Sequence, residues 1–178
     1  MTPLGQAQRT LSRATHFLAG AFRAPAAGPY RARVLGNGLR ELDRFLNLLV
    51  DEVARELAPP GFDHPAFARR RNTARKLRLV LARMERPSPH EARLRAIGRS
   101  RDCLFHCGGI VRRGREKSLA AAWPDAVPVA GRALSVLPAD LASVCRFYDV
   151  LAADLLAALA AHGRGHCFLE PTALYRRG

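Results

Sequence analysis

The sequence is poor in lysine, in aromatic residues and in long apolar runs. Lys76 and Lys117 are the only lysines, so arginine supplies nearly all of the 29 basic side chains. Aromatic residues make up 7% of the chain, but the apolar fraction is 48%, which argues against wholesale disorder. No apolar run approaches the roughly 20 residues that a membrane-spanning helix needs, so we expect no membrane span. Ala and Leu are abundant and β-branched residues are few, which favours helices.

Acidic residues are missing from the first forty positions, Glu41 being the first, and the formal net charge is +14. The basic N-terminal region faintly resembles a transit peptide, but an ordinary helix is the simpler interpretation. A charge this high attracts polyanions, with nucleic acid first and anionic membrane surfaces second. Arginine adds a planar fork that binds phosphate through two hydrogen bonds. A GC-rich genome would produce the same arginine bias, so charge alone does not decide the function.

Cysteine is also scarce, and the four cysteines contain no Cys-x-x-Cys pair. Without a secretory context we expect free thiols in a reducing, cytoplasmic location. A metal site built from Cys103, His106 and Cys107, with His166 and Cys167 from the tail, is a weak alternative because it lacks a recognisable zinc signature. We therefore expect no metal and no small-molecule cofactor.

Helical periodicity dominates the rest of the chain. Apolar residues recur in steps of three and four over 35–57, and weaker stripes predict helices over 4–23, 66–85 and 138–162. Ser88-Pro-His-Glu91 has the pattern of a capping box, and the helix that it opens should end at Gly108-Gly109. These elements predict an all-α fold, an antiparallel four-helix up-and-down bundle with an extra N-terminal helix and an irregular excursion over 112–138. The expected divisions are a basic helix and linker over 1–29, a bundle over 30–163 and a tail over 164–178.

The most informative residues lie near the end of the fourth of these helices, in Arg101-Asp102-Cys-Leu-Phe-His106. The spacing from Arg101 to His106 is expected by chance in a chain so rich in arginine. However, Arg101 falls on the apolar stripe of its helix, where a charge is costly unless it is paired or faces a cleft. Asp102 shares a side with His106, as does Arg99, whereas Arg101 is about 140° from His106 around a straight helix. Arg101 and His106 converge only if the helix turns near its end.

This segment resembles the Arg-x4-6-His motif of the HEPN superfamily, whose members are small helical bundles. Asp102 fits the polar residue that follows the motif arginine in many members, and Ile97 to Val111 has the cadence of the motif helix. The resemblance implies metal-independent RNA cleavage, with His106 as general acid/base, Arg101 stabilising the phosphorane and Asp102 orienting one of them. It also implies a homodimer in which two motifs face one groove. Some members bind nucleic acid or partner proteins without catalysis.

Two other functions fit parts of the sequence. A non-catalytic module would bind nucleic acid through phosphates alone, because no helix-turn-helix pattern or aromatic interleaving supports base recognition. A phosphatase-like loop is suggested by Cys107 and Arg113 in Cys-x5-Arg spacing and by Trp123-Pro-Asp125, although a helix rather than a strand precedes the cysteine. The expected nucleic-acid contacts are basic residues of three segments, namely Arg69, Lys76 and Arg83, Arg99, and Arg112 and Arg113.

Overall fold

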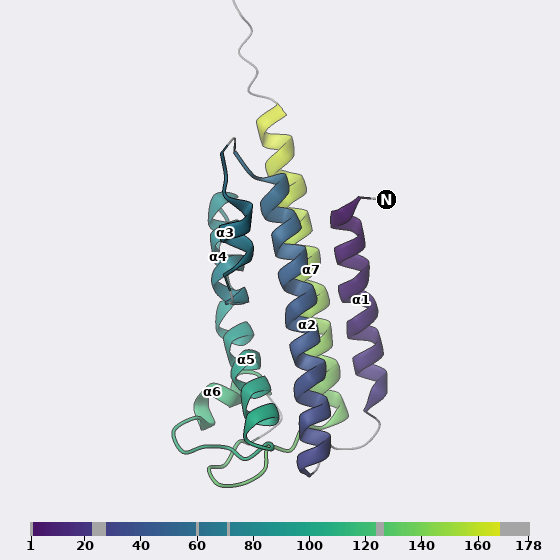
Figure 1. The fold of residues 1–178 in the computed structure, drawn as a ribbon, viewed down its shortest axis with the longest axis vertical. Coiled ribbons are helices and arrows are strands. Elements are labelled where there is room, and N and C mark those ends of the chain that lie inside the picture. The colour runs from purple at the N-terminus through teal and green to yellow at the C-terminus, as the bar shows by residue number, and fades with distance from the viewer. Residues whose placement is uncertain (1, 23–27, 60, 71, 124–126, 168–178) are drawn as a thin grey trace, which may run out of the picture.

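The computed structural model describes residues 2–22, 28–59, 61–70, 72–123 and 127–167. Seven helices follow one another in this part of the chain: α1 (Pro3–Ala21), α2 (Pro29–Glu56), α3 (His64–Ala68), α4 (Thr73–Arg83), α5 (Glu91–His106), α6 (Glu116–Ala120) and α7 (Pro138–Cys167) (Figure 1). The described residues contain no strand, and an isolated antiparallel bridge joins Ile110 to Ala133. The all-α prediction is therefore confirmed. No helix in the described part is long and apolar enough to cross a membrane.

Three long helices, α1, α2 and α7, pack together, and the chain from α3 to α6 covers the other side of α2 (Figure 1). The predicted apolar stripe on α2 forms the centre of the core, because Leu35, Leu39, Leu42, Leu46 and Leu49 are all at most 1% exposed. Leu11 and Leu18 of α1 are buried in the same core. The N-terminal helix is thus an integral layer of the fold, and the finer prediction of a four-helix up-and-down bundle is not confirmed.

The helix predicted over 66–85 is wrong as a single element. It is divided into α3 and α4, with Asn72 capping α4 by accepting a hydrogen bond of 2.9 Å from the backbone N–H of Arg75. Asparagine is among the strongest N-cap residues. α4 then runs antiparallel to α5. Arg78 in the middle of α4 forms an ion pair with Glu91 at the start of α5 (3.6 Å), while Thr73 at the start of α4 shares a hollow with Asp102 near the end of α5.

Two predicted helix ends also differ from the structure. The capping box at Ser88 does not form, because α5 begins at Glu91 without a side-chain cap and the Glu91 carboxylate pairs with Arg78 and Arg95 instead. α7 begins at Pro138 as predicted, but it continues to Cys167 rather than ending at His162. Glycine inside a helix costs about 1 kcal/mol and does not by itself end it, so Gly163 is a weaker stop signal than we expected.

The segment 112–138 is largely irregular, as predicted, but part of it is firmly packed. It contains the short helix α6, and the completely buried Trp123 donates a hydrogen bond of 2.9 Å from its indole N–H to the Ser100 hydroxyl of α5. Pro124, Asp125 and Ala126 lie outside the described residues. The segment is thereby fixed against the helix that carries the candidate site.

Candidate functional site

α5 ends in a tight reversal at the predicted glycine pair. Gly108 and Gly109 have φ values of 59° and 85°, in the left-handed region that favours glycine. The backbone N–H groups of Cys107 and Gly109 both donate to the Cys103 carbonyl at 3.1 Å. The helix therefore stays regular through His106, and the chain turns back only after it.

The chain beyond this reversal is held by the second half of the 112–138 segment. Val111 donates to the Arg132 carbonyl at 2.9 Å, and Leu134 donates to the Gly109 carbonyl at 2.8 Å. A turn then follows in which the Arg115 N–H donates to the Arg112 carbonyl at 3.1 Å. These backbone bonds place Arg112 and Arg115 beside the last turns of α5.

A cavity of about 330 Å³, here called the His106 cleft, opens at this point. Three arginines and one histidine face a single acidic residue in its wall, and the lining consists of Arg99, Asp102, Cys103, His106, Cys107, Arg112, Arg115 and Leu119. None of the three arginines forms an ion pair with a carboxylate of the described chain. His106 is exposed, and its ring makes an edge contact with Phe105 at 4.8 Å between centroids. The cleft therefore offers unneutralised cations and an imidazole to an anionic ligand.

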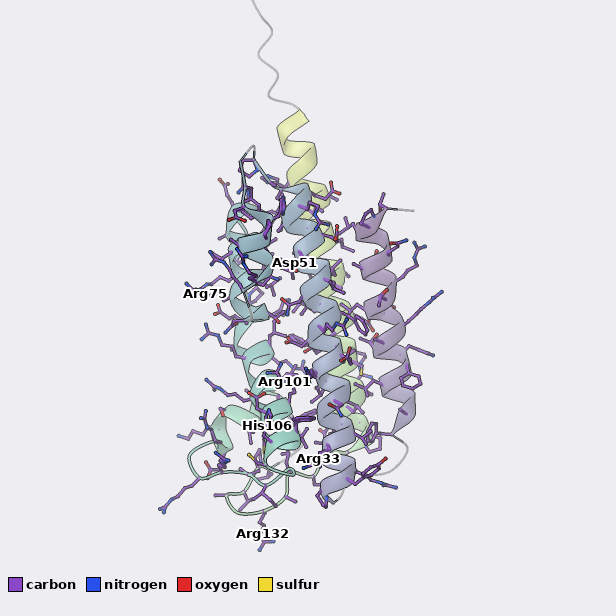
Figure 2. All side chains as sticks on the ribbon, in the orientation of Figure 1. Arg33, Asp51, Arg75, Arg101, His106 and Arg132 are labelled. Atoms are coloured by element: carbon purple, nitrogen blue, oxygen red, sulfur yellow. The ribbon has the colours of Figure 1, made fainter. Side chains whose placement is uncertain are left out.

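Arg101 does not line this cleft. Its guanidinium bonds Asp43 of α2 at 3.2 Å and Asp102 at 2.9 Å, and it faces a neighbouring hollow of about 590 Å³ between α4 and α5, here called the α4–α5 groove. Because α5 is regular through His106, the separation of the two side chains around the helix is kept. Figure 2 labels both on α5, with His106 nearer α6. The structure thus brings Asp102 and Arg99 to His106, but not Arg101.

The carboxylates around Arg101 explain how a charge is accommodated on an apolar stripe. Burial raises the pKa of Asp43, while a hydrogen bond from Thr73 and the charges of Arg101 and Lys76 act in the opposite direction. Burial likewise raises the pKa of the fully buried Tyr148, and the Asp43 charge adds to this effect. Arg101 therefore forms a structural ion pair that joins α5 to Asp43 of α2, and this pair compensates its charge at the α4–α5 groove.

The predicted nucleic-acid contacts lie in different environments. The predicted phosphate contact of Lys76 has to be corrected, because this side chain is 1% exposed. It pairs with Asp51 at 2.5 Å and lies over the Phe67 ring at 5.2 Å. It has no access to a phosphate. Arg69, Arg83 and Arg113 are exposed away from the His106 cleft, whereas Arg99 and Arg112 line it.

Arg115 is the residue of the cleft that the sequence analysis missed. A signal was present, because Gly114 interrupts the basic run at 112–115 and has a φ of 79°, which indicates a turn that brings its neighbours together.

The geometry of the cleft gives little support to a phosphatase-like loop or to a metal site. The Cys107 N–H is already bonded to Cys103, α5 precedes the cysteine, and Arg113 is outside the cleft, none of which suits a phosphatase loop. No three His, Cys, Asp or Glu residues within the described ranges are grouped to hold a metal ion. The side chains of His166 and Cys167 lie outside the described structure. Burial raises the pKa of Cys103, and it raises that of Cys145 to about 12, so both disfavour the thiolate.

Comparison of the chain with protein-family models, with curated proteins and with solved structures gave no match. Of the predicted Arg-Asp-x-x-x-His motif, Asp102 and His106 line the His106 cleft and Arg101 does not.

Proposed function

We propose that this protein binds RNA in the His106 cleft and cleaves it without a metal ion, as an endoribonuclease of the HEPN kind. The observation that carries the proposal is that His106 shares a hollow of about 330 Å³ with three arginines that have no acidic partner in the described chain. Arginine recognises phosphate oxygens through paired hydrogen bonds, and a histidine titrates near neutral pH. The expected cytoplasmic location and helical-bundle family are parts of the same proposal.

In the proposed reaction, the neutral imidazole of His106 removes the proton from a 2′-hydroxyl. The resulting oxygen attacks the adjacent phosphorus, and the bond to the 5′-oxygen of the next nucleotide breaks. The imidazolium returns the proton to that leaving oxygen, so the products are a 2′,3′-cyclic phosphate and a free 5′-hydroxyl. Arginines beside the phosphorane stabilise its additional negative charge.

In this proposal Arg99 binds the phosphate in place of Arg101, and its position in the wall of the cleft supports that role. Arg99 has six residues between it and His106, so it too satisfies the Arg-x4-6-His spacing, and it lines the cleft. Arg101 is then a positioning residue, because it neutralises Asp102 at the rim and reduces the repulsion between that carboxylate and a phosphate. A homodimer that brings two clefts together would supply a second His106.

The test is cleavage of a labelled RNA pool in EDTA by the wild type and by single variants. We expect His106→Ala to lose about 10²–10⁴-fold in rate, as is usual for a general acid/base, and Arg99→Gln to lose more than Arg101→Gln. Arg9→Gln on α1 removes the same charge far from the cleft and serves as the matched control. Undiminished cleavage by His106→Ala would contradict the proposal.

A second candidate is a module that binds RNA without cleaving it, which the exposed arginines outside the cleft also favour. Binding that falls steeply with salt, with no cleavage by the wild type, would select this alternative.

A further inference from the structure

The α4–α5 groove is as strongly basic as the cleft itself. Five arginines line it (Arg75, Arg78, Arg95, Arg99 and Arg101) against the two aspartates Asp43 and Asp102. Both aspartates are engaged by Arg101, and Arg78 and Arg95 share the single carboxylate of Glu91. Arg75 and Arg99 have no ion pair with any carboxylate of the described residues. The groove therefore keeps an excess of positive charge after its internal pairs are counted.

The groove and the His106 cleft adjoin one another. Arg99 and Asp102 line both hollows, so the two share a wall on α5. Arg95, Arg99, Asp102 and His106 are spaced by four, three and four residues, which puts them within about 60° of one helix face. At 1.5 Å per residue this line is about 16 Å long, or about five nucleotides of a stacked strand at 3.4 Å each. Arg75 of α4 flanks the far part of the line (Figure 2).

We propose that the groove continues the cleft as a track for one nucleic-acid strand of about five nucleotides, which runs along α5 from His106 to Arg95 and Arg75. The inference rests on the proposed function and extends it to the substrate, which it identifies as single-stranded RNA. The two hollows, of about 330 and 590 Å³, offer room for one backbone, whereas a duplex would have to lie across their rims. The apolar residues in the groove wall are Ala74 and Leu94, and no aromatic ring is there to stack on a base, so recognition should be independent of sequence.

Binding of fluorescein-labelled 2′-O-methyl oligouridylates tests the track, because these strands lack the attacking hydroxyl and stay intact. For the wild type we expect an octanucleotide to bind about tenfold more tightly than a trinucleotide. The Arg75→Gln/Arg95→Gln variant should lose this advantage and keep its affinity for the trinucleotide. Its slope of log K against log salt for the octanucleotide should be shallower by about 1.4, at about 0.7 for each lost phosphate contact with a single strand.

Arg9→Gln/Arg13→Gln on α1 is the matched control, since it removes equal charge from the opposite side of the molecule. The track is refuted if the octanucleotide has no advantage, if the groove variant retains it, or if the α1 variant loses it equally. Failure of the wild type to bind even the trinucleotide, or indifference of that binding to Arg99→Gln, would instead overturn the proposed function. Melting temperatures confirm that each variant is folded before it is compared.

Discussion

At the scale of single residues, Arg101 shows how a charge can occupy an apolar helix face. The sequence placed it on the stripe and implied that it needs a partner or a cleft. The partner is Asp43, which lies 58 residues earlier on α2. A stripe reveals that a charge must be compensated, but the identity of the compensating residue depends on how two helices are aligned.

Asp43 leads to a prediction about pH. Because burial raises its pKa above the ordinary value of 3.8, the folded protein binds this proton more tightly than the unfolded chain does. Stability from this group is therefore present at low pH and is lost as pH rises through the raised pKa. Asp43→Asn imitates the protonated form, so the free energy of unfolding of the wild type should fall relative to the variant as the pH rises from below 3.8 through the raised pKa. Urea denaturation across that range measures this, and a relative gain by the wild type would show that the pKa is lowered instead.

Lys76 is a basic residue whose burial could not be predicted from the sequence. Its place seven residues from Arg69 and from Arg83 suggested one exposed basic stripe. The break at Asn72 separates Arg69 from the helix of the other two, and Asp51 offers a carboxylate in the interior. Neither fact follows from the spacing of basic residues.

At the scale of helices, the contact between α2 and α5 depends on Gly36. A Cβ atom added there would lie 3.0 Å from the Phe105 backbone nitrogen and 3.3 Å from the Leu104 Cβ, atoms that cannot move independently of the helix. The glycine therefore sets how closely the helix that carries His106 approaches the core.

We expect Gly36→Ala to lower the free energy of unfolding by about 1–3 kcal/mol through overpacking. Gly98→Ala is the matched control, because an added Cβ there meets nothing within 4 Å and the change should stabilise α5 by about 0.5–1 kcal/mol. Chemical denaturation of both variants provides the measurement. Equal effects of the two substitutions would mean that α2 and α5 are not in close contact at Gly36.

The helices that could be predicted best have a strong local signal. The uninterrupted leucine stripe of α2, the Pro138 start of α7 and the glycine pair after α5 all match the structure. The division of α3 from α4 and the failure of the Ser88 capping box depend on which partner a polar side chain finds. Similarly, Asp102 and Arg99 could be assigned to the His106 side by helix geometry, while Arg115 required knowledge of the turn at Gly114.

At the scale of the whole molecule, α1 is a structural layer despite its basic composition. It packs on both α2 and α7, and Thr15 donates a hydrogen bond of 2.8 Å to Asp149 of α7. Gly38 of α2 allows α1 to approach α2 closely, since a Cβ atom added at Gly38 would lie 2.5 Å from the Leu18 side chain of α1.

Deletion of residues 1–22 should therefore lower the stability of the protein as well as reduce its net positive charge. It removes the buried Leu11 and Leu18 and exposes apolar surface on α2 and α7, and a single buried leucine is worth about 2–5 kcal/mol. We expect a lower melting temperature and binding of a hydrophobic dye. The Arg9→Gln/Arg13→Gln variant, which keeps the helix but not its charge, should melt near the wild type. An unchanged melting temperature after the deletion would show that α1 is dispensable for folding.

The bond between Trp123 and Ser100 also has a practical consequence. Trp123 is the only tryptophan, and it is completely buried against α5, the helix that bears His106. It follows Leu119, which lines the His106 cleft, by four residues. Indole emission is sensitive to its hydrogen bond and to water. The intrinsic fluorescence of the protein thus reports on the segment that borders the His106 cleft, without any attached label.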